Sequence, residues 1–511
     1  MNAVFAHGVL HVCKRLTSCL ASLGVLAPML LASPVSALER LRADLPLLRS
    51  QITLELGQAE TAQDLLEANP YLLELDRAGN GAVIKVLRQV LTAPLPRQTA
   101  GVFQESAGHP LLEQILLAAS ALVKVEGVHS EISGRNLSEA LNAAYRDGQP
   151  HLLGVLRRLP GTTASIDLQA LLFYAKRQAR QQQDAAQLVK QLPAALPFSS
   201  ASQSMELGLG WRRVVQSLPA SHRSQPLQVV VLQPKSGANG RVVVVSHGLW
   251  DEPTSFEGWG QWLAGRGYTV LMPVHQGSDS NQQQALLGGK QAPPSAAELR
   301  LRPLDVSLLL DAVEAGTLLP GNSLKTREVA MVGHSWGATT TLQLAGLATT
   351  SAQLRTRCQN PRDPDRNLSW MLQCSWLEAS ERSSLADPRI KAAVAVSPPL
   401  SLLFDSRSGS KLTAKVLLVS GTRDWVVPPG PEAIAPLRQG TPMANGHRLV
   451  LADGGGHFNL RAPADQLGVP VLAPLIEAWI NQQLKLPSTH RFDSGHWGNA
   501  DLSLVDVTPR L

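Results

Sequence analysis

The chain has 511 residues, of which 44% are hydrophobic and 17% are charged, and its formal net charge is +6. This length predicts two or three domains, and the composition excludes an intrinsically disordered chain. The small positive excess gives no basis for nucleic-acid binding, although it permits peripheral contact with an anionic membrane surface.

The first 37 residues match the pattern of a Sec-type signal peptide. Lys14 and Arg15 supply positive charge, residues 20–32 are mostly apolar, and Val35-Ser36-Ala37 fits a small-x-small cleavage site. An apolar stretch of ~13 residues is shorter than the ~20 that a membrane span needs, which disfavours the alternative of an uncleaved anchor. We therefore expect export, to the periplasm or as a secreted protein.

Residues 38–192 are expected to form an all-α domain. Apolar residues recur at helix spacing through 111–125, and Asn136 and Asp167 are suited to cap the helices that follow them. Strand-like alternation is sparse apart from residues 50–56. The proline- and serine-rich residues 193–206 then predict a linker.

From residue 207 the pattern changes to short β-branched runs separated by segments of helix length. Several runs lack polar alternation, as strands buried on both faces do, so residues 207–486 predict an α/β domain with a mostly parallel sheet and helices on both faces. The last helix is expected at 469–486, followed by a polar C-terminal tail over 487–511. The expected strands are residues 228–234, 241–248, 268–275, 328–335, 390–398, 415–421 and 447–454.

The strongest motif is Gly333-His334-Ser335-Trp336-Gly337, which fits the G-x-S-x-G pattern of a nucleophilic serine. An apolar strand precedes it and a helix-like run follows it, which is the context that the motif requires. The glycines allow neighbouring backbone to approach a strained serine, and the helix N-terminus favours negative charge there. The motif therefore predicts an α/β-hydrolase fold with Ser335 as nucleophile.

The serine hydroxyl is a poor nucleophile unless a base accepts its proton. His457 follows the last expected strand, and the glycines at 454–456 would let this loop bring the imidazole over Ser335. We therefore predict His457 as the base, with a surface loop histidine as the alternative interpretation.

The imidazole needs a carboxylate that fixes its tautomer and stabilises its cation. Asp424 lies just past an expected strand, and the chain order Ser335, Asp424, His457 is that of α/β-hydrolases. Asp405 and Asp453 are the rival acids, and a turn aspartate that caps the next segment is the structural alternative for Asp424.

Two backbone N–H groups are expected to form an oxyanion hole. One belongs to Trp336, directly after the nucleophile, and the other to Leu249, in the loop after the strand that ends near His247-Gly248. His247 is then more typical of a structural loop residue than of a base.

Three tryptophans lie at positions that predict a substrate pocket. Trp250 follows the oxyanion loop, Trp425 follows the predicted acid, and Trp370 lies in an insertion at about 350–389 that would act as a lid. Ordinary packing is the alternative. The rings favour a hydrophobic acyl or aromatic ester over a sugar or a peptide.

Cys358 and Cys374 lie in the same insertion. Two thiols in an oxidising compartment often pair, so a disulfide is expected, with two buried thiols as the alternative. Neither cysteine belongs to a metal-ligand pattern, and the sequence predicts no metal and no cofactor.

Residues 207–485 resemble the platelet-activating-factor acetylhydrolase-like group of α/β-hydrolases, which overlaps with predicted dienelactone hydrolases. The matching pieces are SHGL, HxGSD at 275–279, GHSWG, RPLDVSLLLD and GGGHF. The resemblance implies hydrolysis of esters, often of acyl chains on lipids, with oxyanion donors at Leu249 and Trp336.

Two further points follow from this resemblance. Some animal members carry the acid one strand earlier, where this chain has Ser397-Pro398-Pro399, and that departure supports Asp424. Residues 151–172 resemble an uncharacterised helical domain found before such hydrolases in cyanobacteria, which implies no known activity.

The sequence thus predicts a serine esterase acting on acyl esters of lipids, in the manner of a phospholipase A2 or acetylhydrolase. The alternatives are a carboxylesterase or dienelactone-type hydrolase of small soluble esters and, in another class, an inert exported protein that binds the envelope. The intact Ser335–His457–Asp424 set disfavours the last. No oligomeric state is predicted.

Overall fold

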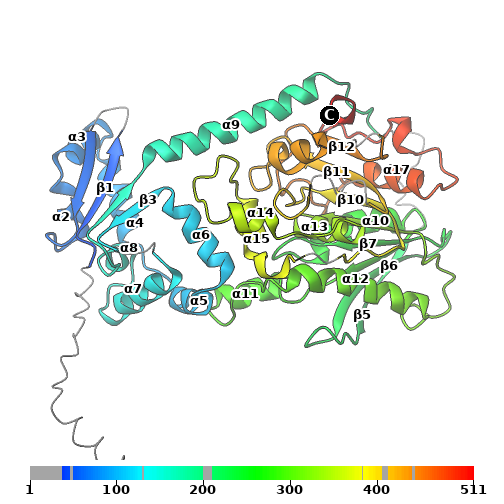
Figure 1. Cartoon of the computed structure of the whole chain (residues 1–511), viewed down its shortest axis with the longest axis horizontal. Helices are drawn as coiled ribbons and strands as arrows, with labels where there is room; N and C mark the ends of the chain where they lie inside the picture. Colours follow the sequence, from blue (N-terminus) through cyan, green and yellow to red (C-terminus); the bar gives the residue numbers. More distant parts are fainter. Residues whose placement is uncertain are drawn as a thin grey trace, which may run out of the picture.

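The computed structural model describes residues 37–45, 50–128, 132–198, 210–381, 384–405, 412–439 and 444–511. The predicted signal peptide, apart from Ala37, lies outside these residues. The described residues form an N-terminal domain and a larger α/β domain, and a long helix passes from the first to the second (Figure 1). No helix in the described part of the chain combines the length and the hydropathy of a membrane span.

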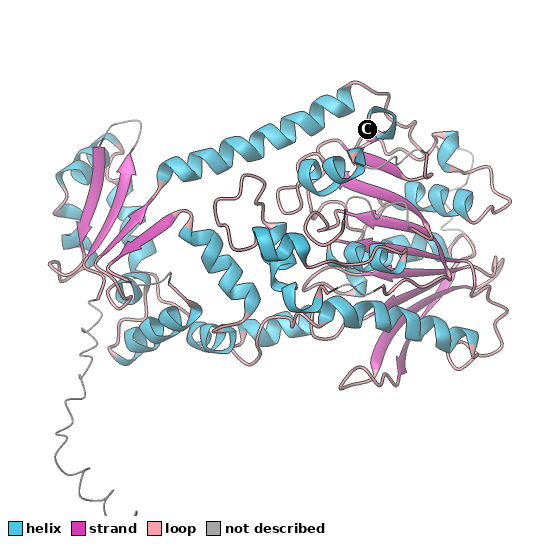
Figure 2. Cartoon of the chain, in the orientation of Figure 1, coloured by secondary structure: helices cyan, strands magenta, loops and turns pink. Residues whose placement is uncertain are grey.

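The N-terminal domain contains a four-stranded sheet, so the prediction of an all-α domain is wrong. The strand order is β2-β1-β4-β3, with β1 antiparallel to β2 and parallel to β4 (Figure 2). The strand-like residues 50–56 correspond to β2, whereas the other three strands are too short or too weakly alternating to be distinguished from helices. They are β1 (Arg40–Leu45), β2 (Ser50–Glu55), β3 (Val123–Glu126) and β4 (Thr163–Ile166).

The helix predicted over residues 111–125 is divided between two elements. The helix α6 (Pro110–Ser120) ends before the apolar run does. The last residues of the run belong to the strand β3. An apolar run does not by itself distinguish a helix from a strand.

Side-chain caps begin most of the helices of this domain, but not α4 and α5. Asp167 caps α9 as predicted, accepting the Ala170 N–H at 2.9 Å, but Ser133 caps α7, where Asn136 is already in the first turn. The remaining helices are α2 (Ala62–Glu67), α3 (Pro70–Ala78), α4 (Ala82–Thr92), α5 (Gln98–Ser106), α7 (Gly134–Arg146) and α8 (Leu152–Leu156).

The helix α9 (Leu168–Lys190) connects the two domains. Near its start, the Tyr174 hydroxyl donates to the carbonyl of Pro361 at 3.0 Å. Near its end, Leu188 and Val189 pack into the core of the α/β domain. Both ends of α9 are therefore anchored to the second domain.

The α/β domain is built on a mostly parallel sheet, as predicted, but the sheet has nine strands because β5 and β13 extend it beyond the seven expected. The six central strands from β8 to β12 are parallel, whereas β5, β6 and β13 join the sheet antiparallel. In sheet order the strands are β13 (Leu504–Asp506), β12 (Arg448–Ala452), β11 (Lys415–Gly421), β10 (Ile390–Val396), β9 (Val329–His334), β7 (Val242–Ser246), β8 (Thr269–Pro273), β6 (Leu227–Pro234) and β5 (Trp211–Leu218).

Helices cover both faces of this sheet. On β7, Val242 and Val244 face one apolar core and Val243 and Val245 face the other, which explains the unbroken run of valines. The first core includes α12 (Glu298–Glu314), α13 (Trp336–Leu344) and α15 (Ser369–Ser375), and the second includes α10 (Glu257–Ala264) and α17 (Ala473–Gln483).

The predicted linker and polar tail pack together on the α/β domain. Residues 199–206 of the linker lie outside the described residues, but the Ala195 N–H donates to the Leu504 carbonyl at 2.8 Å. Phe492 and Trp497 of the tail are buried and stack with ring centroids 5.0 Å apart. The tail thus continues the fold, because a few apolar residues within a polar segment are enough to anchor it.

The insertion before β10 packs between the two domains. Arg366 donates to Gln114 of α6 at 2.8 Å, and α15 packs on that helix. Within the insertion a disulfide joins Cys358 and Cys374, as predicted, with a sequence separation of 16 residues.

Removing the disulfide is expected to destabilise the protein. Replacing both cysteines by serine frees a loop of this length in the unfolded chain, which should lower the free energy of unfolding by roughly 3 kcal/mol. Urea unfolding of the double variant and of wild type with and without reductant would measure the loss. Equal stability of oxidised and reduced wild type would contradict the prediction.

Candidate active site

Ser335 lies at a strained turn between β9 and α13. Its backbone has φ 53° and ψ −120°, a conformation that residues with a side chain rarely adopt. Its N–H donates to the Val396 carbonyl of the neighbouring strand at 2.9 Å, which ties the turn to the sheet. The predicted strand, turn and helix around the serine are therefore present.

Close approach of the backbone explains the two motif glycines. A Cβ atom on Gly333 would lie 2.1 Å from the carbonyl oxygen of Gly337, and one on Gly337 would lie 2.1 Å from the carbonyl oxygen of Ser246. No side chain fits at either position. The first turn of α13 consequently lies directly against the end of β7.

His457 and Asp424 form a buried hydrogen-bonded pair. His457 Nδ1 lies 2.9 Å from Asp424 Oδ2, and Asp424 Oδ1 accepts the N–H groups of Val426 and Val427 at 3.0 and 2.8 Å. The carboxylate is fully buried and held from both sides. A proton on Nδ1 leaves Nε2 of the imidazole as an acceptor, which is the tautomer that a general base needs.

The two rival acids lie elsewhere. Asp453 Oδ1 accepts the Thr422 hydroxyl at 3.2 Å, and Asp405 is exposed after β10. The geometry therefore pairs Asp424, the predicted acid, with His457.

His334 positions the loop that carries His457. Its Nε2 lies 2.9 Å from the His457 carbonyl, and the two imidazole rings are 4.7 Å apart between centroids. Burial, together with the nearby His457, lowers the pKa of His334 well below its usual value, so a neutral ring donates this hydrogen bond. His457 is thereby held beside the residue that precedes Ser335.

The two predicted oxyanion donors have backbone N–H groups without a protein acceptor among the described residues. Trp336 is the first residue of α13, where an N–H has no partner within the helix, and Leu249 follows β7. A Cβ atom on Gly248 would lie 3.3 Å from the Ser335 Cβ, so this loop adjoins the serine.

Arg302 of α12 connects both of these segments. Its fully buried guanidinium donates to the carbonyls of His247 and Gly248 at 2.7 and 3.1 Å and to the Ser278 hydroxyl at 3.0 Å. Its Cζ lies 4.3 Å from the centroid of the Trp336 ring. Arg302 is therefore a positioning residue for the loop after β7 and for the start of α13.

A second Ser-His-Asp set lies close to the Arg302 contacts. His275 Nε2 is 2.8 Å from Ser246 Oγ, and its Nδ1 is 2.8 Å from Asp305 Oδ2. Ser246 and His275 have no exposed surface, so no substrate reaches them and the set is structural. It joins the end of β7 to the HxGSD loop and to α12.

Burial and charge shift the pKa values in this second set. Burial is the largest effect on His275 and lowers its pKa to about 4. Burial opposes ionisation of Asp305, but hydrogen bonds from His275 and Arg223 outweigh it and lower its pKa to about 2. His275 is therefore neutral and Asp305 is ionised at neutral pH.

The three tryptophans predicted to line the pocket lie in different environments. Trp425 is half-exposed next to the acid, and Trp250 is half-buried with its Nε1 donating to Gln282 at 2.7 Å. Trp370 is buried in the first core with the Arg357 Cζ 4.6 Å from its centroid, so it does not line an open pocket. Apolar packing, the alternative interpretation, describes Trp370.

The sequence analysis did not assign roles to Arg302, His275 and Asp305. The motifs that carry them, RPLDVSLLLD and HxGSD, contributed only to the family resemblance. The helix that carries Arg302 and Asp305 also contains exposed charged residues such as Arg300, so the sequence did not distinguish the buried charges from those on the surface.

Comparisons with protein-family models and with curated proteins found no match for this chain. In the described part of the chain, no group of three or more His, Cys, Asp and Glu side chains is arranged to hold a metal ion. The assignment of the site therefore depends on its own geometry.

Replacing Arg302 is expected to slow the ester hydrolysis that the sequence predicts, without abolishing substrate binding. Arg302→Lys retains a cation but loses the two-pronged contact with the His247 and Gly248 carbonyls, so kcat should fall about 10²-fold with a smaller change in KM. Arg300→Lys, at an exposed position of the same helix, is the matched control. An unchanged kcat in Arg302→Lys would remove the positioning role.

The buried histidines predict a loss of stability in mild acid. His275 has a pKa of about 4 in the fold, against 6.5 for an ordinary histidine, so the unfolded chain binds more protons between these values. The free energy of unfolding should therefore decrease as the pH falls from about 6.5 towards 4.

Urea unfolding at several pH values would test this dependence. His275→Gln should reduce the loss of unfolding free energy between about pH 6.5 and 4 by at most about 3 kcal/mol. His496→Gln, at an exposed site, should leave this loss unchanged. A stability that rises as the pH falls to 4.5 would contradict the prediction.

Proposed function

We propose that the chain is a serine hydrolase that cleaves carboxylic esters, with Ser335 as nucleophile, His457 as general base and Asp424 as its acid partner. The observation that carries the proposal is the 2.9 Å contact between His457 Nδ1 and Asp424 Oδ2. Asp424 follows β11 and His457 follows β12, which are parallel strands. Both residues therefore lie at the carboxyl ends of the strands, where the strained Ser335 precedes α13.

In the proposed reaction, Ser335 Oγ attacks the ester carbonyl carbon while His457 Nε2 accepts the hydroxyl proton. The N–H groups of Leu249 and Trp336 stabilise the negative charge on the carbonyl oxygen. The alcohol leaves with the proton from His457, and an acyl-enzyme remains. Water, deprotonated by the same imidazole, then releases the carboxylic acid and restores the serine.

Exposed apolar rings support an acyl ester of a lipid as the substrate class. Trp425 and Phe458 directly follow the proposed acid and base, and they are 53% and 54% exposed. Large apolar side chains that stay in water beside a polar site favour a hydrophobic ligand. The resemblance of residues 207–485 to the platelet-activating-factor acetylhydrolase-like group agrees with this proposal.

We also propose that the protein is exported and acts in the periplasm or outside the cell. The disulfide between Cys358 and Cys374 supports an oxidising compartment, because the cytosol keeps most thiols reduced. The pattern of residues 1–37 supports the same location.

Labelling with a fluorophosphonate and hydrolysis of p-nitrophenyl esters of increasing chain length would test the activity. Ser335→Ala should abolish labelling, and Ser335→Ala and His457→Ala should each lower kcat by roughly 10⁴-fold or more. Wild type should prefer the longer acyl chains.

The acid is tested by matched carboxamide variants. Asp424→Asn should lower kcat strongly, whereas Asp405→Asn and Asp453→Asn should retain activity. A loss confined to Asp405→Asn would reassign the acid. Absence of labelling in folded wild type would favour an inert binding protein and reject the proposal.

A further inference from the structure

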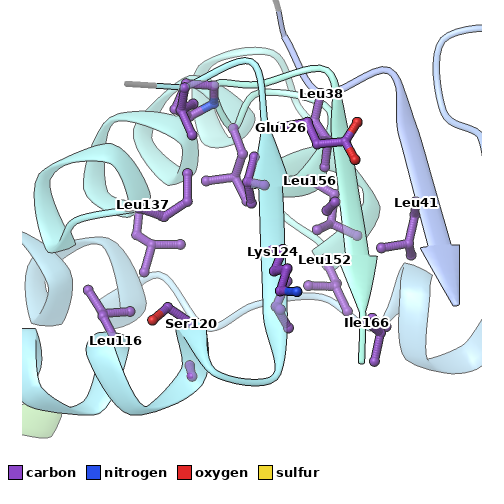
Figure 3. Close-up of a pocket in the computed structure, with 18 of the residues that line it drawn as sticks. Leu38, Leu41, Leu116, Ser120, Lys124, Glu126, Leu137, Leu152, Leu156 and Ile166 are labelled. Atoms are coloured by element: carbon purple, nitrogen blue, oxygen red, sulfur yellow. The ribbon is translucent and has the colours of Figure 1, made fainter. Parts of the chain in front are cut away.

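A large apolar cavity, partly open to solvent, lies in the N-terminal domain between its sheet and its helices (Figure 3). Its volume is about 950 Å³. Its lining comes from β1, β3 and β4 of the sheet and from α6, α7 and α8, together with Pro361 and Arg362 of the insertion. The residues that line it include none of the proposed catalytic or oxyanion residues, so it is separate from that site.

The chemistry of the walls selects an apolar ligand. In Figure 3, Leu116 of α6 and Leu137 of α7 lie on one side of β3, and Leu152 and Leu156 of α8 and Ile166 of β4 lie on the other. Apolar side chains that line a hollow open to solvent remain in contact with water, and an apolar ligand in the hollow would remove that contact. A volume in this range is typical of ligand pockets.

The charges at the cavity select an anionic head group. Lys124 and Arg362 line the cavity and are exposed, and neither forms a salt bridge among the described residues. Glu126, which also lines it, is paired with Arg42 at 3.4 Å, which offsets its charge. Two uncompensated cations beside an apolar hollow complement a molecule with a hydrocarbon chain and a carboxylate.

We propose that this cavity binds a long-chain fatty acid, with the hydrocarbon chain inside and the carboxylate near Lys124 and Arg362. The proposal does not rest on the proposed esterase activity, because no proposed catalytic residue lines the cavity. It gives the N-terminal domain a ligand-binding function of its own.

Fluorescence titration of the delipidated protein with cis-parinaric acid tests the site, followed by displacement with saturated fatty acids of 8 to 14 carbons. Each added CH₂ buried in the cavity should tighten binding roughly fourfold, until the chain outgrows it. Methyl esters of the same acids should bind more weakly, because they lack the carboxylate. An affinity that is independent of chain length would overturn the proposal.

Variants locate the binding. Leu137→Trp should fill the hollow and weaken binding at least tenfold. Ala119→Trp, at an exposed lining position that tolerates a larger side chain, should do the same if Leu137→Trp does not fold. Val86→Trp, at an exposed apolar position away from the cavity, is the matched control and should bind as wild type does.

The charge contribution is measured in the same way. Lys124→Gln and Arg362→Gln should each weaken binding of the acid but not of its methyl ester, with Lys85→Gln as control. Ser335→Ala should still bind the acid, which separates failure of this proposal from failure of the esterase proposal. Absence of probe binding, or a dimer that Ala119→Trp dissociates, would assign the cavity to another role and reject the fatty-acid site.

Discussion

One buried guanidinium joins the parts on which the candidate site depends. Arg302 holds the loop after β7 through the carbonyls of His247 and Gly248, and it stacks on Trp336 at the start of α13. An unpaired cation in this interior would be costly, so its acceptors must be in place before the fold is stable. The two predicted oxyanion donors therefore take their positions from the same interaction that satisfies the buried charge, together with the close contact at Gly337.

The local features of the site were predictable because each follows from a short stretch of sequence. An apolar strand and two glycines define the turn at Ser335, and parallel strands bring the residues that follow them, Asp424 and His457, to one edge of the sheet. Arg302 could not be assigned in this way. Its partners His247 and Ser278 lie 55 and 24 residues away, and only the folded chain brings them to the helix.

The errors in the N-terminal domain have the same origin. β1 pairs with β4 across more than a hundred residues, with Arg40 opposite Thr163, so no local period reveals the sheet. The polar composition of residues 487–511 gave no sign that isolated residues within them, such as Trp497 and Leu504, are buried. The average polarity of a segment conceals single apolar residues that are buried, although each of them buries as much apolar surface as a core residue does.

The insertion gives the two domains a physical connection through which a ligand in one could affect the other. Pro361 and Arg362 form part of the cavity, while Trp376 lies 4.8 Å from Trp336 between ring centroids. Coupling would require the ligand to bind one arrangement of the insertion more tightly than another. A ligand that binds both arrangements equally does not change the equilibrium between them. The disulfide between Cys358 and Cys374 limits such rearrangement within residues 358–374, so any coupling must pass through the packing of the insertion on α6 and on Trp336.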